Sequence, residues 1–316
     1  MFNDYLDFEY PIIELENKLN ALQSSVESTS LCIKEETLAL QKKIKSLYQS
    51  TFSNLDPWQV VQLARHPQRP HTLDLISLIF QDFELLSGDR FSAEDEALVG
   101  GLATFQGRPV MVVGQEKGRD VKDRVKRNFG MPQPQGFRKS KRLFEMAEKF
   151  SLPLITLIDS PGAYAGVSAE LNNQSEAIAS NILSLCNLKT PIITVVIGEA
   201  MSGGAMAVGV GDHCAMLEYS IYAVISPEGC ASILWKDAQN AQIAADIMQV
   251  SARQLMSNKL IDAIIPEPLG GAHRDHAQTA SFISAHLSKI LPTLEKLDVE
   301  TLKQRRYDKW MLHQLS

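Results

Sequence analysis

Cysteine is scarce in this sequence, and none of it has metal-binding spacing. The 316 residues include only Cys32, Cys186, Cys214 and Cys230, with no CxxC pair. Because zinc ribbons need closely spaced cysteines and disulfide frameworks need paired ones, neither is expected. We predict that the four thiols are buried, as free cysteines usually are.

Long hydrophobic runs are also missing. The best candidate near the middle of the chain, residues 200–211, has 12 uncharged residues, whereas a membrane-spanning helix needs about 18. The first twenty residues carry five acidic side chains, where a signal peptide would need a basic start and an apolar run. With 45% hydrophobic and 22% charged residues, the composition is that of an ordinary globular protein. We therefore expect a cytoplasmic protein without membrane contact.

Positive charge is in deficit overall but concentrated in one segment. The net charge is -6, yet residues 117–142 contain ten basic and two acidic side chains, so this segment carries +8 and the rest of the chain -14. An acidic chain argues against general nucleic-acid binding. The basic segment is compatible with an anionic ligand, an acidic partner or simply a solvated face.

The first fifty residues have the spacing of amphipathic helices. Apolar residues recur at intervals of three and four at Ile12, Leu15, Leu19, Leu22 and Val26, and again at Leu40, Ile44 and Leu47 after a polar stretch at residues 24–30. Each run is too short for a free-standing coiled coil. We expect a helical hairpin that packs on its own domain or on another subunit, and a further helix that begins at Asp56-Pro57.

After residue 90 the pattern changes to short apolar strands that alternate with helices. Residues 97–105 and 109–113 flank Gln106-Gly107 and predict a β-hairpin. Buried strands are expected at 154–158 and 192–197, helices at 172–187 and from 205, further strands at 214–217 and 221–225, and mostly helix in the last 70 residues. We therefore predict an α/β fold with a helical extension at residues 1–90 and a main domain at 91–316.

Two loops of small residues follow the two buried strands. The first spans residues 159–166, and the second, residues 198–205, contains Ser202-Gly203-Gly204. A Ser-Gly-Gly that opens a helix leaves backbone N–H groups free and gives a ligand oxygen room to approach, which suits an oxyanion hole. By themselves, two glycines at a helix start are more simply explained by close helix–strand packing. Neither loop matches a P-loop or a Rossmann glycine pattern.

No catalytic triad is evident among the side chains. The pair His273 and His276 is compatible with metal binding, but without a third ligand in pattern a surface or hydrogen-bonding role is the simpler interpretation. Glu170, Glu176 and Glu199 are acid/base candidates by position only. A site here would depend on backbone donors.

Several long runs make the chain resemble the α subunits of the bacterial acetyl-CoA carboxylase carboxyltransferase. They are residues 63–70 (LARHPQRP), 127–132 (RNFGMP), 224–236 (VISPEGCASILWK) and 265–274 (IPEPLGGAHR). The resemblance covers nearly the whole chain, from residues 6–9 to residues 305–307.

This resemblance implies a crotonase-like fold of repeated ββα units and an α₂β₂ assembly. The α and β subunits would share an active site that moves a carboxyl group from carboxybiotin to acetyl-CoA, giving malonyl-CoA for fatty acid biosynthesis. The partners would be the carboxyltransferase β subunit, the biotin carboxyl carrier protein and biotin carboxylase. Biotin would be carried on the carrier protein, zinc would belong to the β subunit, and ATP would be used elsewhere in the complex.

The resemblance also assigns roles to residues. Gly203 and Gly204 would donate backbone N–H groups to the biotin ureido oxygen. The biotin pocket would be lined by Pro161, Gly162, Ala163, Tyr164, Gly166 and Ser202. From the basic segment, Lys117, Arg119, Lys126 and Arg127 would face CoA phosphates or a neighbouring chain.

The sequence departs from the family pattern at both loops. Ala165 stands where the family usually has proline, and Ala200 and Met201 replace a glycine pair. Because Ser202-Gly203-Gly204 is intact, we expect activity to be retained. The alternatives are a self-sufficient crotonase-type hydratase or decarboxylase and a non-enzymatic assembly scaffold.

Overall fold

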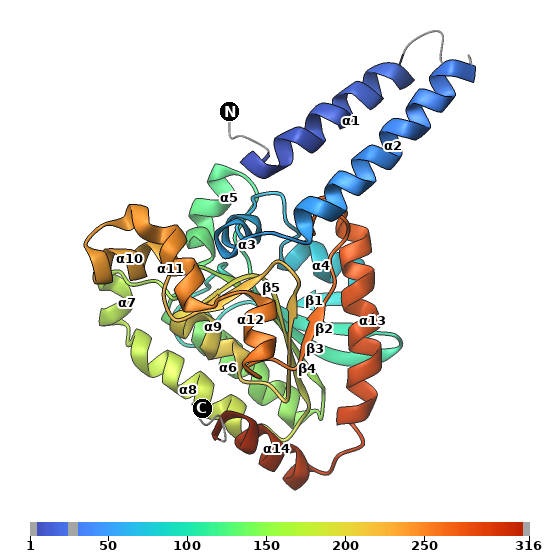
Figure 1. Ribbon diagram of the computed structural model, residues 1–316. Coiled ribbons are helices and arrows are strands. Elements are labelled where there is room, and N and C mark those ends of the chain that lie inside the picture. Colours follow the sequence, from blue (N-terminus) through green and yellow to red (C-terminus); the bar gives the residue numbers. More distant parts are fainter. Residues whose placement is uncertain (1–4, 25–30, 312–316) are drawn as a thin grey trace.

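An eight-stranded mixed sheet runs through the middle of the molecule (Figure 1). The computed structural model describes residues 5–24 and 31–311, and side chains from residue 34 in the second stretch. The strands are β1 (Gln81–Leu85), β2 (Leu98–Phe105), β3 (Arg108–Gln115), β4 (Leu154–Ser160), β5 (Ile192–Met201), β6 (His213–Leu217), β7 (Ile221–Ala223) and β8 (Ala263–Ile265). Their order is β1-β2-β3-β4-β5-β6-β8, with β7 paired to β5.

The predicted β-hairpin is confirmed at one end of this sheet. Strands β2 and β3 pair antiparallel from Leu98 opposite Gln115 to Phe105 opposite Arg108. The two turn residues, Gln106 and Gly107, both have positive φ, at 49° and 77°. A two-residue turn with this backbone matches the twist of the strands that it joins.

The other half of the sheet is parallel, which brings the carboxyl ends of its strands to one edge. Strands β3, β4, β5, β6 and β8 are parallel neighbours. The pairing of β4 with β5 is regular up to Ile158 opposite Val196 and then shifts, so that Ser160 lies opposite Ala200. The two strands therefore lose their regular ladder where the two small-residue loops begin.

Helices cover both faces of the sheet (Figure 1). One face packs against α6 (Pro134–Lys149), α8 (Gln174–Asn187), α9 (Ser202–Gly209) and α12 (Ala252–Ser257), and the other against α4 (Thr72–Ile79) and α13 (His276–Leu294). Helix α14 (Val299–Met311) contacts both cores, through Trp310 and Leu302. The remaining helices are α1 (Tyr10–Gln23), α2 (Leu31–Phe52), α3 (Pro57–Ala64), α5 (Val121–Lys126), α7 (Val167–Leu171), α10 (Pro227–Trp235) and α11 (Ala241–Met248), with 3-10 turns at Asp7–Glu9, Asn128–Gly130 and Ala238–Asn240. The two buried strands predicted at 154–158 and 192–197 are β4 and β5, which lie in the middle of the sheet and are buried along their whole length.

The N-terminal hairpin is present and projects from the rest of the molecule, with α1 beside α2 (Figure 1). Its base packs on the main domain through Ile12, Ile44, Tyr48 and Phe52, which join Leu63 and Tyr219 in one buried cluster. Farther out, Leu38 is exposed. The predicted polar interruption at residues 24–30 lies, from residue 25 on, outside the described residues, as does Val26.

Three sequence-based predictions need correction. β1 and α4 precede residue 90 but belong to the sheet and its core, so the part that lies apart from the sheet is shorter than 1–90. The predicted strand at 221–225 ends at Ala223. Of the thiols, Cys214 is buried but Cys186 is exposed and Cys230 is only partly buried, because α8 and α10 each turn one face to the surface; the side chain of Cys32 lies outside the described part.

Candidate active site

The two small-residue loops meet at the carboxyl edge of β4 and β5. The first loop follows β4 and leads into α7, and the second is the junction between β5 and α9. Met201 ends β5, and α9 begins at once with Ser202, whose φ of 54° is left-handed. A left-handed residue other than glycine is uncommon, and such strain tends to occur at functional sites. The Ser-Gly-Gly was predicted to open a helix, and it does.

The first turn of α9 presents free backbone donors. No described side chain caps the helix, and the first N–H groups of any helix have no acceptor within the helix. Gly203 is partly exposed, and a Cβ placed there would contact only the side chain of Ile178, at 3.4 Å. The surface over Gly203 is therefore open to a ligand oxygen, and the helix dipole favours negative charge there.

Gly204 is a glycine for a different reason. It is buried, and a Cβ on it would lie 2.5 Å from the backbone N of Ala163 and 2.6 Å from the carbonyl carbon of Gly162. Both clashing atoms belong to the backbone, which cannot move aside as the end of a flexible side chain can. Gly204 therefore lets the second loop pack directly against the first, so the packing interpretation holds for Gly204 and the open-donor interpretation for Gly203.

Hydrogen bonds within the first loop and to the segment at residues 130–132 hold this loop in place. The Ser160 hydroxyl donates to the carbonyl of Gly130 at 2.7 Å and accepts from the N–H of Gly162 at 3.1 Å. The N–H of Tyr164 donates to the carbonyl of Pro132 at 3.0 Å. The Tyr164 ring lies over Gly166, where a Cβ would be 2.3 Å from the phenol oxygen. Pro161 is exposed and lines a hollow with Lys117, Asp159 and Glu199, whereas Ser202 lines a different hollow. The predicted biotin pocket stays a prediction.

A buried ionic network lies next to both loops. Lys117 Nζ is 2.7 Å from Asp159 Oδ1 and 2.8 Å from Glu199 Oε1, and Arg65 reaches Glu199 and Glu228 at 2.8 and 2.7 Å. Burial alone would raise the pKa of Glu199, but the charges of Lys117 and Arg65 outweigh it and hold that pKa below its usual value. Glu199 is therefore held as an ion-paired carboxylate, and its role as an acid/base candidate stays a prediction.

The four predicted phosphate-contacting cations all have partners within the chain. The ion pairs are Lys117 with Asp159 and Glu199, Arg119 with Asp74, Lys126 with Glu96, and Arg127 with Asp123. Arg119 also donates to the carbonyl of Arg69. Glu170 and Glu176, the two other carboxylates considered, are exposed. The basic segment is thus largely neutralised where it meets the rest of the molecule.

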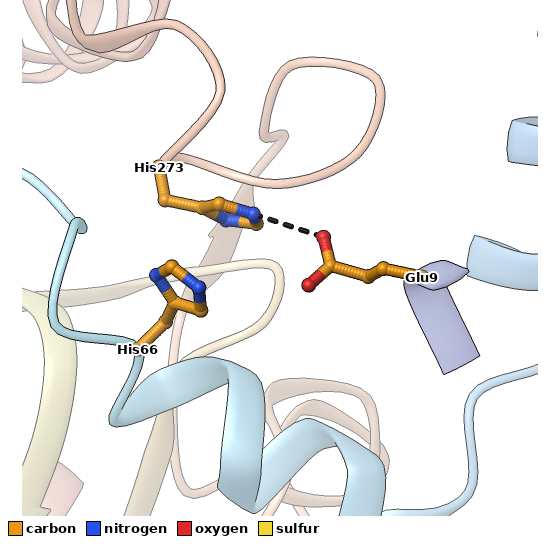
Figure 2. Close-up of side chains that lie close together, drawn as sticks. All are labelled: Glu9, His66 and His273. Carbon is orange, nitrogen blue, oxygen red and sulfur yellow. Dashed lines mark hydrogen bonds and ion pairs between the residues drawn. The ribbon is translucent and has the colours of Figure 1, made fainter. Parts of the chain in front are cut away.

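A second buried cluster, Glu9, His66 and His273, was not predicted (Figure 2). Three distant segments supply it, and Glu9 Oε1 lies 3.1 Å from His273 Nε2. The imidazole rings are stacked, with centroids 4.1 Å apart and planes at 30°, so their in-plane lone pairs do not converge on one ion between them. His66 Nδ1 also accepts from the N–H of Gln68. This arrangement fits an ionic attachment of the N-terminal segment better than a metal centre.

The loop at residues 268–274 contains the Gly270-Gly271 pair and His273, and its contacts with the N-terminal hairpin explain why these residues are there. Gly270 and Gly271 have φ of 91° and 97°, and a Cβ on Gly270 would lie 2.6 Å from the Tyr48 ring. His273 bonds Glu9, and Arg274 forms an ion pair with Glu16 at 2.5 Å. The loop therefore receives the base of the helical hairpin. Of the predicted histidine pair, only His273 takes part, while His276 Nε2 lies 2.7 Å from the carbonyl of Gln68.

Comparison with known proteins gives matches along nearly the whole chain. The family model for acetyl co-enzyme A carboxylase carboxyltransferase-like proteins matches residues 5–313. The acetyl-coenzyme A carboxylase carboxyl transferase subunits alpha of Histophilus somni and Pasteurella multocida are 56% and 55% identical over 312 residues, covering 98% of this chain and 98% of theirs.

Solved structures show the same fold at lower sequence identity. A transcarboxylase 12S crystal structure aligns with a TM-score of 0.57 and 20% identity, over 70% of this chain and 41% of that one. A Pseudomonas malonate decarboxylase hetero-dimer aligns with a TM-score of 0.54 and 17% identity, over 62% of this chain and 81% of that one. The predicted crotonase-like α/β fold is confirmed. None of the described helices combines the length and apolar character needed to cross a bilayer.

Proposed function

The chain belongs to the acetyl-coenzyme A carboxylase carboxyltransferase-like family, and from that premise we propose how its residues take part in carboxyl transfer. It is the alpha subunit of a multi-subunit carboxylase and a transferase. In our proposal it forms, with a β subunit, the site where a carboxyl group passes from carboxybiotin on the carrier protein to acetyl-CoA. The product, malonyl-CoA, commits carbon to fatty acid biosynthesis.

The observation that carries this proposal is the uncapped first turn of α9 beside the first loop. Bound biotin would supply the carboxyl group and take up negative charge on its ureido oxygen. The N–H of Gly203 would donate to that oxygen, because the surface over Gly203 has room for it. Preorganised donors of this kind stabilise developing charge, and one donor contributes about a hundredfold or more to the rate.

The other predicted pocket residues would hold and enclose the ligand. Gly204 would fix the first turn of α9 against Gly162 and Ala163, and its N–H would be the second donor to the ligand oxygen. Pro161, Tyr164, Gly166 and Ser202 would line the pocket and limit the access of water. These roles leave proton removal from acetyl-CoA to groups outside this chain, because the ion pairs of Glu199 with Lys117 and Arg65 lower its pKa and make it a weaker base.

The exposed apolar side chains of α7, α10 and α11 are our proposed contact with the β subunit. They are Val167, Leu171, Ile233, Leu234, Ile243 and Ile247, each more than half exposed, and the three helices lie on one side of the molecule (Figure 1). An apolar surface of this kind is unusual on a protein that works alone. The projecting part of α1 and α2 is a second candidate for subunit contacts. We place the complex in the cytoplasm, with zinc, the biotin carboxylase and ATP use on other subunits.

The proposal is tested by assaying carboxyl transfer in reverse, from malonyl-CoA to free biotin or biotinylated carrier. This chain alone, the β subunit alone and the mixture are compared. We expect activity only in the mixture. Activity of this chain by itself would instead support a self-sufficient crotonase-type enzyme, and no activity in the mixture would leave an assembly scaffold.

The variant Gly203→Ala tests the donor. A methyl group there meets only Ile178, so the fold should persist while the ligand oxygen is kept away from the N–H. We expect kcat/KM for biotin to fall about a hundredfold with an unchanged melting temperature. Gly204→Ala is the matched comparison, because it should lower both activity and stability. A Gly203→Ala enzyme with wild-type kinetics would remove Gly203 from the site.

A further inference from the structure

Gln115 is a fully buried side chain at the carboxyl end of β3, next to the proposed site but shielded from any ligand. Its Nε2 donates to the carbonyl of Gly204 at 2.7 Å, and its Oε1 accepts from the backbone N–H of Asp159 at 3.2 Å. Only one orientation of the amide satisfies both partners, since a carbonyl can only accept and an N–H can only donate. The Gln115 side chain therefore joins β3, β4 and α9 at one point.

The need for this side chain comes from the irregular pairing of β4 with β5. After Ile158 the register shifts, and the N–H of Asp159 is bonded by Gln115 instead of by the neighbouring strand. The Asp159 carboxylate in turn accepts from the N–H of Glu199 at 3.0 Å and binds Lys117. The amide of Gln115 and the carboxylate of Asp159 replace the missing ladder where the two loops begin.

The turn held by Gln115 is one that would otherwise be free to move. Two adjacent glycines have wide conformational freedom, and Ser202 before them is left-handed. On one side Gly204 rests against Gly162 and Ala163; on the other its carbonyl is held by Gln115. A hydrogen bond to that carbonyl fixes the peptide plane that follows Gly204, and through it the direction of the preceding N–H groups.

We propose that Gln115 is a positioning residue for carboxyl transfer, because its amide sets the first turn of α9 so that the Gly203 N–H meets the ligand oxygen. This inference rests on the proposed function. Gln115 itself touches no reacting atom. Donors must be placed within about half an ångström of the productive geometry, and a displacement of about 1 Å can lower the rate a hundredfold.

The test replaces Gln115 by glutamate, which has the same shape. A carboxylate can still accept from Asp159 but repels the carbonyl of Gly204. A protonated carboxyl group, in contrast, donates to that carbonyl and accepts from Asp159, as the amide does. Because burial raises the pKa of a glutamate, this protonation should fall within the range in which the enzyme can be assayed.

The measurement is kcat and KM for reverse transfer by the reconstituted complex between about pH 5.5 and 8.5. We expect Gln115→Glu to have a kcat about ten- to a hundredfold below wild type at the alkaline end, to approach wild type at the acid end, and to keep the wild-type KM for malonyl-CoA. Gln115→Met should show the same fall without recovery at any pH. This variant keeps the test decisive if the glutamate variant folds poorly.

A matched control comes from a second buried amide, Asn181 on α8, which also bonds a carbonyl of α9. Asn181 Nδ2 donates to the carbonyl of Ala207, at 3.1 Å and one turn farther along α9. Asn181→Asp should give no rise of kcat toward acid pH relative to wild type. A Gln115→Glu or Gln115→Met enzyme with wild-type kcat would overturn the proposal, as would the same acid recovery in Asn181→Asp. Absence of transfer by the wild-type complex would instead reject the proposed function itself.

Discussion

Among the buried ionic clusters in the described part of the chain, two stabilise different things. The first, Lys117 with Asp159 and Glu199, lies where β4 and β5 end. The second, Glu9 with His66 and His273, lies where the N-terminal segment meets the main domain. Both bring together residues from distant segments. The first is continuous by hydrogen bonds with the loops of the site, and the second is continuous with the base of the hairpin.

The two clusters differ in which part of the backbone their carboxylates hold by hydrogen bonds. Near the site, Asp159 accepts from the N–H of Glu199, so the ion pairs fix strand ends that lack regular pairing. At the hairpin, Glu9 accepts from the N–H of Leu6 at 2.8 Å and closes the first turn of the chain. The first cluster should therefore affect both stability and catalysis, and the second should affect stability alone.

The largest effect is expected from Lys117→Met, which removes the cation between two carboxylates. Opening a buried ion pair on one side is expected to lower the free energy of unfolding by about 3–5 kcal/mol. Carboxyl transfer should also fall, because Asp159 would be held beside β5 only by the N–H of Glu199. Urea denaturation and the reverse assay measure the two effects.

The double variant Lys117→Met, Asp159→Asn is the control for Lys117→Met. Because Glu199 keeps its ion pair with Arg65, Asp159 is the charge that the single variant leaves without a cation, and its removal should regain part of the lost stability. A loss below about 1 kcal/mol for the single variant would mean that the network behaves as a solvated surface pair. In that case, the contrast between the two clusters would fail.

Much of the fold could be predicted from local sequence, but the strand at the edge of the sheet could not. The central strands β4 and β5 are buried along their whole length, so continuous β-branched runs identify them. β1 was missed because it is an edge strand with the polar sequence QDFEL and mostly exposed side chains, and such a strand has no hydrophobic pattern. Because β1 was not recognised as a strand, residues 81–85 were placed in the predicted helical extension at residues 1–90.

The two loops of the candidate site could be predicted from the sequence, but the buried side chains that hold these loops in place could not. Runs of small residues identified both loops, because glycine and serine at a strand–helix junction have a local meaning. The supports, which are the Gln115 amide and the ion pairs of Lys117 with Asp159 and Glu199, come together only in the folded chain. Nor does the sequence distinguish Gly203 from Gly204, since the difference lies in what a Cβ would meet.

A smaller effect is expected from Glu9→Gln at the hairpin. Burial alone would raise the pKa of Glu9, but its hydrogen bonds to His273 and Leu6, with the charges of both histidines, lower it below its usual 4.5. A carboxyl group whose pKa is lower in the folded than in the unfolded state stabilises the fold above its unfolded pKa. We expect Glu9→Gln to lower the free energy of unfolding at pH 7 by about 2 kcal/mol and to leave kcat unchanged.

The pH dependence separates charge from shape in this variant. The contribution of Glu9 is complete above about pH 5 and declines as the pH falls through the folded-state pKa. Denaturation curves at pH 7 and pH 4 should therefore show wild type losing more stability than Glu9→Gln. Equal losses of stability in the two proteins would mean that the Glu9 charge is unimportant. A lower kcat in Glu9→Gln would mean that the cluster at the hairpin also affects the active site.

The smallest effect is expected from Arg274→Gln, at the outer edge of the same junction. Arg274 binds Glu16 at 2.5 Å and lies 5.6 Å from the centre of the Tyr48 ring, and the side chains of the pair are about one quarter exposed. Partial solvation reduces such a pair to about 1 kcal/mol or less. Arg253→Gln, in a more exposed pair with Glu218, is the matched control and should change the free energy of unfolding less. If Arg274→Gln instead equalled Glu9→Gln, the attachment of the hairpin would depend on its rim as much as on its buried centre.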